Sequence, residues 1–223
     1  EAWGLVRGCT PTAAMTLCHE AARSQSYLQA SESLSLVGGL EVSPNTIHRL
    51  ANHVGPDMER WASEREPAKP GNLKDIIVCL QTDMTGVRML KRYLGGVKGK
   101  DGDPKTRQIK CATLFLMQRG GDGEYHRLPD TAIHIISFDD PVTFSAKLKT
   151  ALDKLGVPFG TELIVVGDGA ERIWNIVDDR FKWATGIVDF WHAAGHVNEL
   201  CEAVCDDSDE QKKMFAQWRH KLK

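Results

Sequence analysis

Residues 162–177, ELIVVGDGAERIWNIV, join an apolar run to a helix-like pattern through a Gly-Asp-Gly turn at 167–169. The run at 163–166 predicts a short buried strand, and the apolar spacing over 170–181 predicts a helix. Asp168 therefore stands at the carboxyl end of a buried strand. This position suits either a side chain that caps the following helix or a carboxylate that binds a metal ion.

The segments on both sides of this stretch predict a mixed sheet with helices packed on it. Apolar runs indicate three strands, with a glycine- and lysine-rich turn at 95–103, and an amphipathic helix follows them. The expected elements are strands at 75–80, 87–93 and 109–117, a helix at 141–155, a strand at 163–166, a helix at 170–181, a strand at 184–190 and a helix at 192–204. This order is that of an α/β protein with a ribonuclease-H-like mixed sheet flanked by helices.

The first 66 residues are predicted to form a separate helical region. Thr10 and Pro11 fit the start of a first helix that continues to about Gln29. Residues 33–55 then have the pattern of a helix-turn-helix. Two prolines and a glycine among charged residues at 64–72 indicate a linker. The expected organisation is a helical region at 1–66, a linker at 67–72, an α/β core at 73–192 and a helical segment at 193–223.

The helix-turn-helix pattern carries candidate DNA contacts. Gly38 and Gly39 predict its turn, and Ser43 followed by Pro44 predicts the start of its second helix. Apolar residues at 47, 50, 51 and 54 share one face, so the opposite face is expected to be exposed. The candidate DNA contacts on that face are Asn45, His48 and Arg49. A helical hairpin that does not touch DNA is the alternative.

The charge of the chain is unevenly distributed. The formal net charge is only −2, but residues 88–110 hold eight Lys or Arg against two Asp. A local basic stripe can neutralise phosphates in a nearly neutral protein, although a solvated hairpin surface is the alternative. The candidate phosphate contacts in this segment are Lys98, Lys100, Lys105 and Arg107.

The cellular setting is indicated by what the sequence lacks. No apolar run approaches the roughly 20 residues that span a bilayer, and no signal-peptide pattern opens the sequence. The six cysteines form no CxxC pair, which is typical of reduced thiols in a reducing compartment. We therefore expect a cytoplasmic protein without a membrane partner.

Two carboxylates are candidates for a metal site. Asp83 is expected just past the first strand, and Asp168 ends the fourth. In a ribonuclease-H-like sheet these two strands are adjacent and parallel, so their carboxyl ends would bring both side chains together. Magnesium prefers such hard oxygen ligands, and two ions about 4 Å apart can drive phosphodiester cleavage. Glycines at 86, 167 and 169 would let a substrate backbone approach. Local turn and capping roles are the alternative for each Asp.

A zinc site built on the last predicted helix is the less favoured alternative. His192 and His196 lie four residues apart, and Cys201 and Cys205 follow. On a continuous helix the histidines occupy one edge and the cysteines the other side, so they do not share one metal. Cys201 is expected to be a core thiol on the apolar flank formed by residues 197, 200 and 204.

Four sequence motifs occur together in this chain. They are TDMTGVRM at 82–89, GKDGDPKTRQIK at 99–110, VVGDGAERIWN at 165–175 and DFWHAAGH at 189–196. In this order and spacing the chain resembles insertion-sequence transposases of the Kra type, bacterial relatives of the Mutator-like transposases. The resemblance covers roughly residues 75–200, with a weaker match in the helix-turn-helix pattern.

The resemblance implies a DDE transposase. Asp83 and Asp168 match the first two catalytic carboxylates and metal ligands of the family, and Asp189 with His192 matches its Asp-x-x-His signature; His196 is a neighbouring supporting residue. Such enzymes use two magnesium ions, for which manganese can substitute. They act on double-stranded DNA, both transposon ends and target, as oligomers in a synaptic complex. A nucleoid-associated location follows.

The family's third carboxylate is a Glu that follows a helical insertion. The resemblance implies that Lys223, the last residue of the sequence, lies inside that insertion. The third carboxylate is therefore not assigned to a residue here. Glu199 and Glu202 are acidic but occupy the wrong place for it. Two other functions stay open: a non-catalytic or domesticated DNA-binding remnant, and a ribonuclease-H-like nuclease of another family.

Overall fold

The computed structural model describes residues 4–89 and 106–222. Its chain divides into two units, Glu1–Arg65 and Glu66–Lys223. Each unit has its own cluster of buried apolar side chains. The candidate metal ligands lie in the second unit, so its sheet decides how they are placed.

Three capped helices form the first unit. They are α1 (Pro11–Arg23), α2 (Tyr27–Gly38) and α3 (Pro44–Glu64). The prediction of one helix running to about Gln29 is wrong, because the Ser26 side chain accepts a hydrogen bond from the Gln29 amide and starts a new helix. The predicted turn is confirmed, since Gly39 takes the left-handed conformation at φ 61° that favours glycine.

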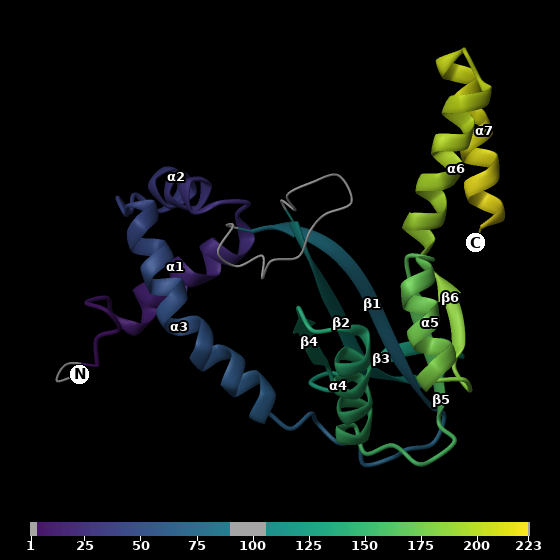
Figure 1. Ribbon diagram of the computed structural model, residues 1–223, viewed down its shortest axis with the longest axis horizontal. Helices are drawn as coiled ribbons and strands as arrows, with labels where there is room; N and C mark the ends of the chain where they lie inside the picture. Colours follow the sequence, from purple (N-terminus) through teal and green to yellow (C-terminus); the bar gives the residue numbers. More distant parts are fainter. Residues whose placement is uncertain (1–3, 90–105, 223) are drawn as a thin grey trace. The chain divides into compact units, whose positions relative to one another are not determined.

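The second unit is built on a mixed sheet. Its central strand β1 (Ile76–Arg88) pairs antiparallel with β2 (Thr106–Arg119) and parallel with β5 (Glu162–Gly167). Strand β6 (Thr185–Val188) then pairs parallel with β5, which gives the order β3-β2-β1-β5-β6 (Figure 1). The adjacency and parallel direction expected for the strands before Asp83 and Asp168 are therefore confirmed.

The first strand is much longer than predicted. Strand β1 continues past Leu80 to Arg88, because every residue from Ile76 to Arg88 has a partner on β2. The prediction of a separate strand at 87–93 is therefore wrong at its start, because residues 87 and 88 are the last two of β1. Residues 90–93 and the turn predicted at 95–103 lie outside the described residues. The structure also contains two short strands on the outer edge of β2 that were not predicted: β3 (Tyr125–Arg127) and β4 (Ile133–Ser137).

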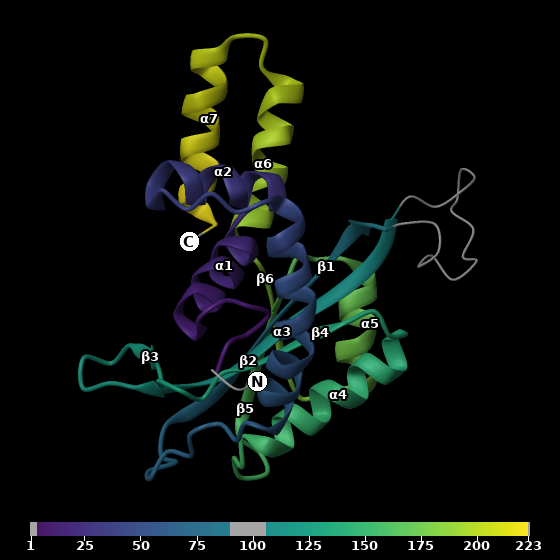
Figure 2. The same ribbon diagram turned by 90° about the vertical axis from the view of Figure 1, so that its left-hand side faces the viewer.

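Helices α4 (Pro141–Lys154) and α5 (Glu171–Arg180) cover one face of the sheet, as Figures 1 and 2 show. Alternate residues of each strand point toward them, as the two-residue period of a strand requires. The buried side chains between sheet and helices include Val78, Leu80, Leu114, Leu116, Phe144, Leu148, Leu163, Val165, Ile176 and Phe181. Gln81, Asp83 and Thr85 of β1 point to the opposite face of the sheet, where they are exposed.

The last two helices form an antiparallel pair, α6 (Phe190–Val204) and α7 (Ser208–Lys221), visible in both ribbon views. Cys201 is buried, as predicted for a core thiol. The prediction that the apolar flank next to Cys201 faces the core is wrong, because Leu200 is 56% and Val204 60% exposed. All six cysteines are free thiols. Within the described residues, none of the helices combines the length and apolarity needed to cross a membrane.

A tight contact between α5 and β6 gives a stability prediction. A Cβ atom added at Gly186 would lie 2.6 Å from Cζ3 of Trp174, so Gly186→Ala forces the indole to move. We expect the variant to lose about 1–3 kcal/mol of unfolding free energy in urea denaturation. Gly86→Ala is the matched control, because its nearest neighbour, Cβ of Thr106, would lie at an ordinary 3.6 Å. Equal stabilities of the two variants would contradict the contact.

Candidate active site

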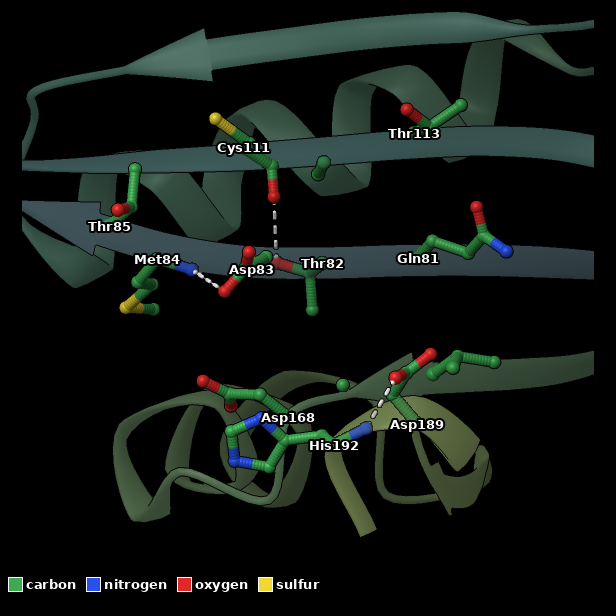
Figure 3. A pocket seen from close by; sticks show the side chains of 13 residues that line it. Gln81, Thr82, Asp83, Met84, Thr85, Cys111, Thr113, Asp168, Asp189 and His192 are labelled. Carbon is green, nitrogen blue, oxygen red and sulfur yellow. Dashed lines mark hydrogen bonds between the residues drawn. The ribbon is translucent and has the colours of Figure 1, made fainter. Parts of the chain in front are cut away.

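A cavity of about 670 Å³ lies on the polar face of the sheet. Its walls come from β1, β2, the end of β5 and the junction of β6 with α6, as Figure 3 shows. The side chains that line it include Gln81, Asp83, Thr85, Cys111, Thr113, Asp168, Asp189 and His192. The four residues that the sequence analysis connected to catalysis through the resemblance, at 83, 168, 189 and 192, therefore line one cavity.

Strand register explains why the three aspartates share this cavity. Gln81 of β1 pairs with Val166 of β5 at the end of that ladder, and Asp83 and Asp168 each lie two residues beyond this pair. Gly167 of β5 is level with Val188 of β6, so the next residue places Asp168 beside Asp189. The Asp189 amide also donates to the Gly167 carbonyl at 2.7 Å, which continues the pairing beyond β6. The three aspartates therefore come from neighbouring parallel strands, with Asp83 inside β1, Asp168 directly after β5 and Asp189 directly after β6.

The position of Asp83 differs from the prediction. Asp83 lies within β1 and pairs with Cys111 of β2, rather than just past the end of the strand. It shares a face with Gln81 and Thr85 because side chains alternate along a strand. This alternation places the Asp83 side chain over the polar face of the sheet. The sequence analysis had expected Asp83 at the end of the strand instead.

Each carboxylate is held by a local backbone amide. Oδ1 of Asp83 accepts from the Met84 amide at 2.6 Å, and Oδ1 of Asp168 accepts from the Ala170 amide at 2.9 Å. Asp168 is not the cap of α5, since the capping position is Ala170, which makes no side-chain cap bond. Asp189 does cap α6, with Oδ1 accepting from the His192 amide at 3.0 Å. Within residues 4–89 and 106–222, the second oxygen of each carboxylate accepts no hydrogen bond.

The remaining side chains of the cavity include an imidazole and a thiol. The imidazole of His192 lies beside the Asp168 carboxylate in Figure 3. Partial burial raises the pKa of the Cys111 thiol, and the negative charge of Asp83 opposite raises it further. Cys111 is therefore a protonated thiol at neutral pH, which makes it a poor metal ligand. Its carbonyl accepts a hydrogen bond from the Thr82 hydroxyl at 3.1 Å, which fixes the backbone of the cavity wall.

The donor set fits magnesium better than zinc. Carboxylate oxygens are hard ligands, and magnesium is usually held by one or two of them together with water and substrate phosphates. In the part of the chain that the structure describes, no three His, Cys, Asp or Glu side chains converge closely enough to hold a metal by themselves. The open zinc alternative is disfavoured in particular, because Cys201 is buried in the α6–α7 pair while His192 lines the cavity.

The local structure requires glycine at two positions of the site, for reasons that the sequence analysis did not identify. A Cβ at Gly167 would lie 3.1 Å from Cγ2 of Ile173, so Gly167 permits close packing of α5 on β5. Gly169 has φ +84°, a conformation that other residues rarely adopt. Their expected use for substrate approach stays a prediction.

The predicted DNA contacts belong to two different units of the chain. Asn45, His48 and Arg49 are exposed on α3 of the first unit, where the His48 ring packs against Tyr27 at 5.0 Å between ring centroids. In the second unit, Arg107 is exposed and its guanidinium lies 4.8 Å from the centroid of the Phe138 ring.

The basic stripe is only partly described. Lys98, Lys100 and Lys105 lie outside the described residues. Lys110 is buried and donates a hydrogen bond from Nζ to the Asp139 carbonyl. The prediction that Lys110 contributes to a basic surface stripe is therefore wrong.

Sequence analysis missed several cavity residues. Gln81, Thr85 and Thr113 were not singled out, although the two-residue spacing around Asp83 indicates the first two once β1 is known to be continuous. Thr113 follows only from the register, which pairs it with Gln81. Glu199 was given no role, yet its carboxylate contacts Nδ1 of His196 at 3.1 Å.

Comparison with known proteins adds little to this geometry. No protein-family model matches the sequence, and no curated protein matches it. Among solved structures, the chain is similar to the Drosophila P element transposase strand transfer complex at 10% sequence identity and a TM-score of 0.35. The match covers 87% of this chain and 43% of that one, so the chain spans less than half of its length. A TM-score below 0.5 is too low to establish a common fold.

Proposed function

We propose that this chain carries the catalytic cleft of a DDE-type DNA transposase, built on a ribonuclease-H-like sheet. The observation that carries the proposal is that Asp83 of β1, Asp168 directly after β5 and Asp189 directly after β6 line one cavity. Carboxylate oxygens that face a common cavity are the ligands that magnesium prefers. The motif order of the Kra-type transposases supports the same assignment.

In this proposal Asp83 and Asp168 would hold magnesium, with manganese as a substitute. A bound ion of this kind stabilises charge on a transferring phosphate and lowers the pKa of a bound water. The chain's own contribution is to orient the carboxylates: the amides of Met84 and Ala170 each occupy one oxygen and leave the other for the cavity. Asp189 and His192 would support the site from the start of α6.

The partner would be double-stranded DNA, both transposon ends and target, bound by an oligomer of the enzyme. The cavity itself is acidic and repels phosphates, so basic groups at its margin are needed to bind the backbone. The sequence supplies them in residues 88–110, which join β1 to β2. Arg107 is the described side chain of this segment that is exposed and basic.

The activity is tested with a supercoiled plasmid and the purified chain. We expect manganese, and more weakly magnesium, to support conversion of supercoiled to nicked circles, because carboxylate-bound ions drive phosphodiester cleavage. Excess chelator should stop the reaction. RNA–DNA hybrid and four-way junction substrates run in parallel, since preferential cleavage of either favours a nuclease of another family. A plasmid left intact by the wild-type chain with manganese would contradict cleavage by Asp83 and Asp168 without the third carboxylate of the family, which is not assigned in this sequence.

A non-catalytic DNA-binding protein is the second candidate. Its support is the exposed face of α3, where Asn45, His48, Arg49 and Asn52 follow helical spacing. Against it, residues 1–65 hold seven Asp or Glu and five Arg, which is a poor surface for phosphate. Metal-independent binding without nicking in the plasmid assay would favour this candidate.

A further inference from the structure

A separate cavity, of about 270 Å³, lies in the first unit between the turn that precedes α1 and the first two turns of α3. The side chains that line it are Arg7, Cys9, Thr46, Arg49 and Leu50. Leu50 belongs to the apolar cluster of this unit and is only 2% exposed, whereas both arginines are exposed. Two guanidinium groups therefore line a cavity whose walls carry no carboxylate.

A strained turn places Arg7 in the cavity wall. Val6 and Cys9 exchange two backbone hydrogen bonds, at 2.8 and 2.9 Å, so Arg7 and Gly8 are the two central residues of a tight hairpin turn. Both have positive φ, 50° for Arg7 and 80° for Gly8. Glycine, asparagine and aspartate are the usual residues in such turns, so an arginine here adds backbone strain. Strain of this kind is found most often at functional sites, which supports a binding role for the Arg7 side chain.

Both guanidinium groups are available to an anion. In the part of the chain that the structure describes, neither Arg7 nor Arg49 forms an ion pair. The hydrogen bond of the Arg49 side chain runs from Nε to the Asn45 carbonyl at 3.4 Å and does not use Nη1 or Nη2. Arg60 of the same unit differs, because it pairs with Asp57. Guanidinium groups bind the oxygens of carboxylates and phosphates in pairs of parallel hydrogen bonds.

The size and position of the cavity fit a phosphate group. Its volume lies below the roughly 300–1,000 Å³ of pockets that enclose a whole small molecule. Thr46, in the first turn of α3, adds a hydroxyl that can accept a hydrogen bond from Ser43 at 2.9 Å and keep its own proton for a ligand. The positive end of the α3 dipole favours an anion at this turn.

We propose that Arg7 and Arg49 hold one backbone phosphate of double-stranded DNA. The inference rests on the proposed function, which names DNA as the partner. Asn45 and Arg49 are four residues apart on α3 and therefore share one face of the helix, next to His48. A phosphate held at Arg49 would bring this exposed face of α3 against the duplex. Phosphate contacts of this kind set the register of a helix on DNA, and base contacts read the sequence.

The charge of the first unit limits the proposal to a single phosphate. Residues 1–65 hold seven Asp or Glu and five Arg, so most of their surface does not attract DNA. The cavity concentrates two of these five arginines without an acidic neighbour in its lining. One neutralised phosphate contributes about 0.9 to the slope of log K against log salt concentration.

The test measures binding of a fluorescent DNA duplex to the full chain by anisotropy, with chelator present so that no strand is cut. Arg7→Gln and Arg49→Gln should each weaken binding about tenfold, the low end for a hydrogen bond to a charged group, because both side chains are exposed. The double variant should lose less than a hundredfold, since both arginines bind the same phosphate, and should lower the salt slope by about 0.9. Arg7→Lys keeps the charge and should regain only part of the affinity.

The matched control is Arg23→Gln, which removes an exposed arginine of the same unit that does not line the cavity. It should change the affinity less than twofold. Equal losses in Arg23→Gln and Arg7→Gln would overturn the inference, as would unchanged binding by both cavity variants.

A competition experiment separates DNA from a free phosphate as the ligand. Inorganic phosphate should displace the duplex no better than potassium chloride of equal ionic strength. Much stronger displacement by phosphate would overturn the DNA assignment and give the cavity to a small phosphorylated ligand. Plasmid nicking by the wild type together with unchanged binding by the cavity variants strikes this inference alone. A wild-type chain that binds no duplex contradicts the proposed function as well.

Discussion

Replacement of Asp168 by Asn is expected to lower manganese-dependent plasmid nicking by about a thousandfold or more. The substitution keeps the shape of the side chain and removes its charge, so the cation loses an anionic ligand. A bound metal is worth several kcal/mol of transition-state stabilisation, and each 1.36 kcal/mol changes the rate tenfold. Asp83→Asn should act equally strongly, since Asp83 lines the same cavity as Asp168.

Asp179→Asn is the matched control for these variants. Asp179 is an exposed carboxylate on α5 that does not line the cavity, so its replacement should leave the nicking rate unchanged. Rates are compared from initial conversion of supercoiled plasmid, with circular dichroism to confirm folding. Nicking by Asp168→Asn at the rate of the control would remove Asp168 from the catalytic machinery.

Phe144→Ala is expected to destabilise the second unit by about 3–5 kcal/mol, the cost of deleting a buried aromatic ring. Phe144 is fully buried, and its ring packs from α4 into the cluster between the helices and β1, β2 and β5. The cavity left behind has little room to collapse, because sheet residues on one side and α5 on the other are themselves buried.

Val142→Ala on the same helix provides the comparison. Val142 is 64% exposed, so its change in unfolding free energy should stay within about 0.5 kcal/mol. Urea denaturation should show the effect of Phe144→Ala in the transition of Glu66–Lys223 and leave the transition of Glu1–Arg65 in place. Similar midpoints for both variants would contradict the description of the core.

The parts of the fold that were predictable from sequence are those with strong apolar runs. The run before Asp168 forms β5, and the pattern after it forms α5, because both elements bury one side in the main core. The end of β1 was placed too early because its second half alternates polar and apolar residues. Such a strand lacks the continuous apolar signal of a fully buried one.

Other elements gave no usable signal. Strand β3 has three exposed residues and is held only by its pairing with β2. The apolar flank of α6 was assigned to the core because periodicity reports that a face is apolar and does not report what covers it. Residues of that flank, such as Leu200, are exposed because α6 packs along α7 rather than presenting this face to the sheet.

The candidate site was predictable in its membership and less so in its geometry. The motif resemblance supplied Asp83, Asp168, Asp189 and His192, and the structure brings them to one cavity. Their meeting at one cavity depends on strand register, which no local pattern in the sequence encodes. The contact of Glu199 with His196 depends on side-chain rotamers on α6, so sequence spacing alone did not distinguish Glu199 from Glu202.

The most direct test of the central claim is anomalous scattering from crystals of the chain soaked in manganese. The proposed function predicts an anomalous peak in the cavity within coordinating distance of both Asp83 and Asp168. A cavity with no peak at a manganese concentration that saturates transposase-type sites would contradict the claim that these carboxylates form a metal site.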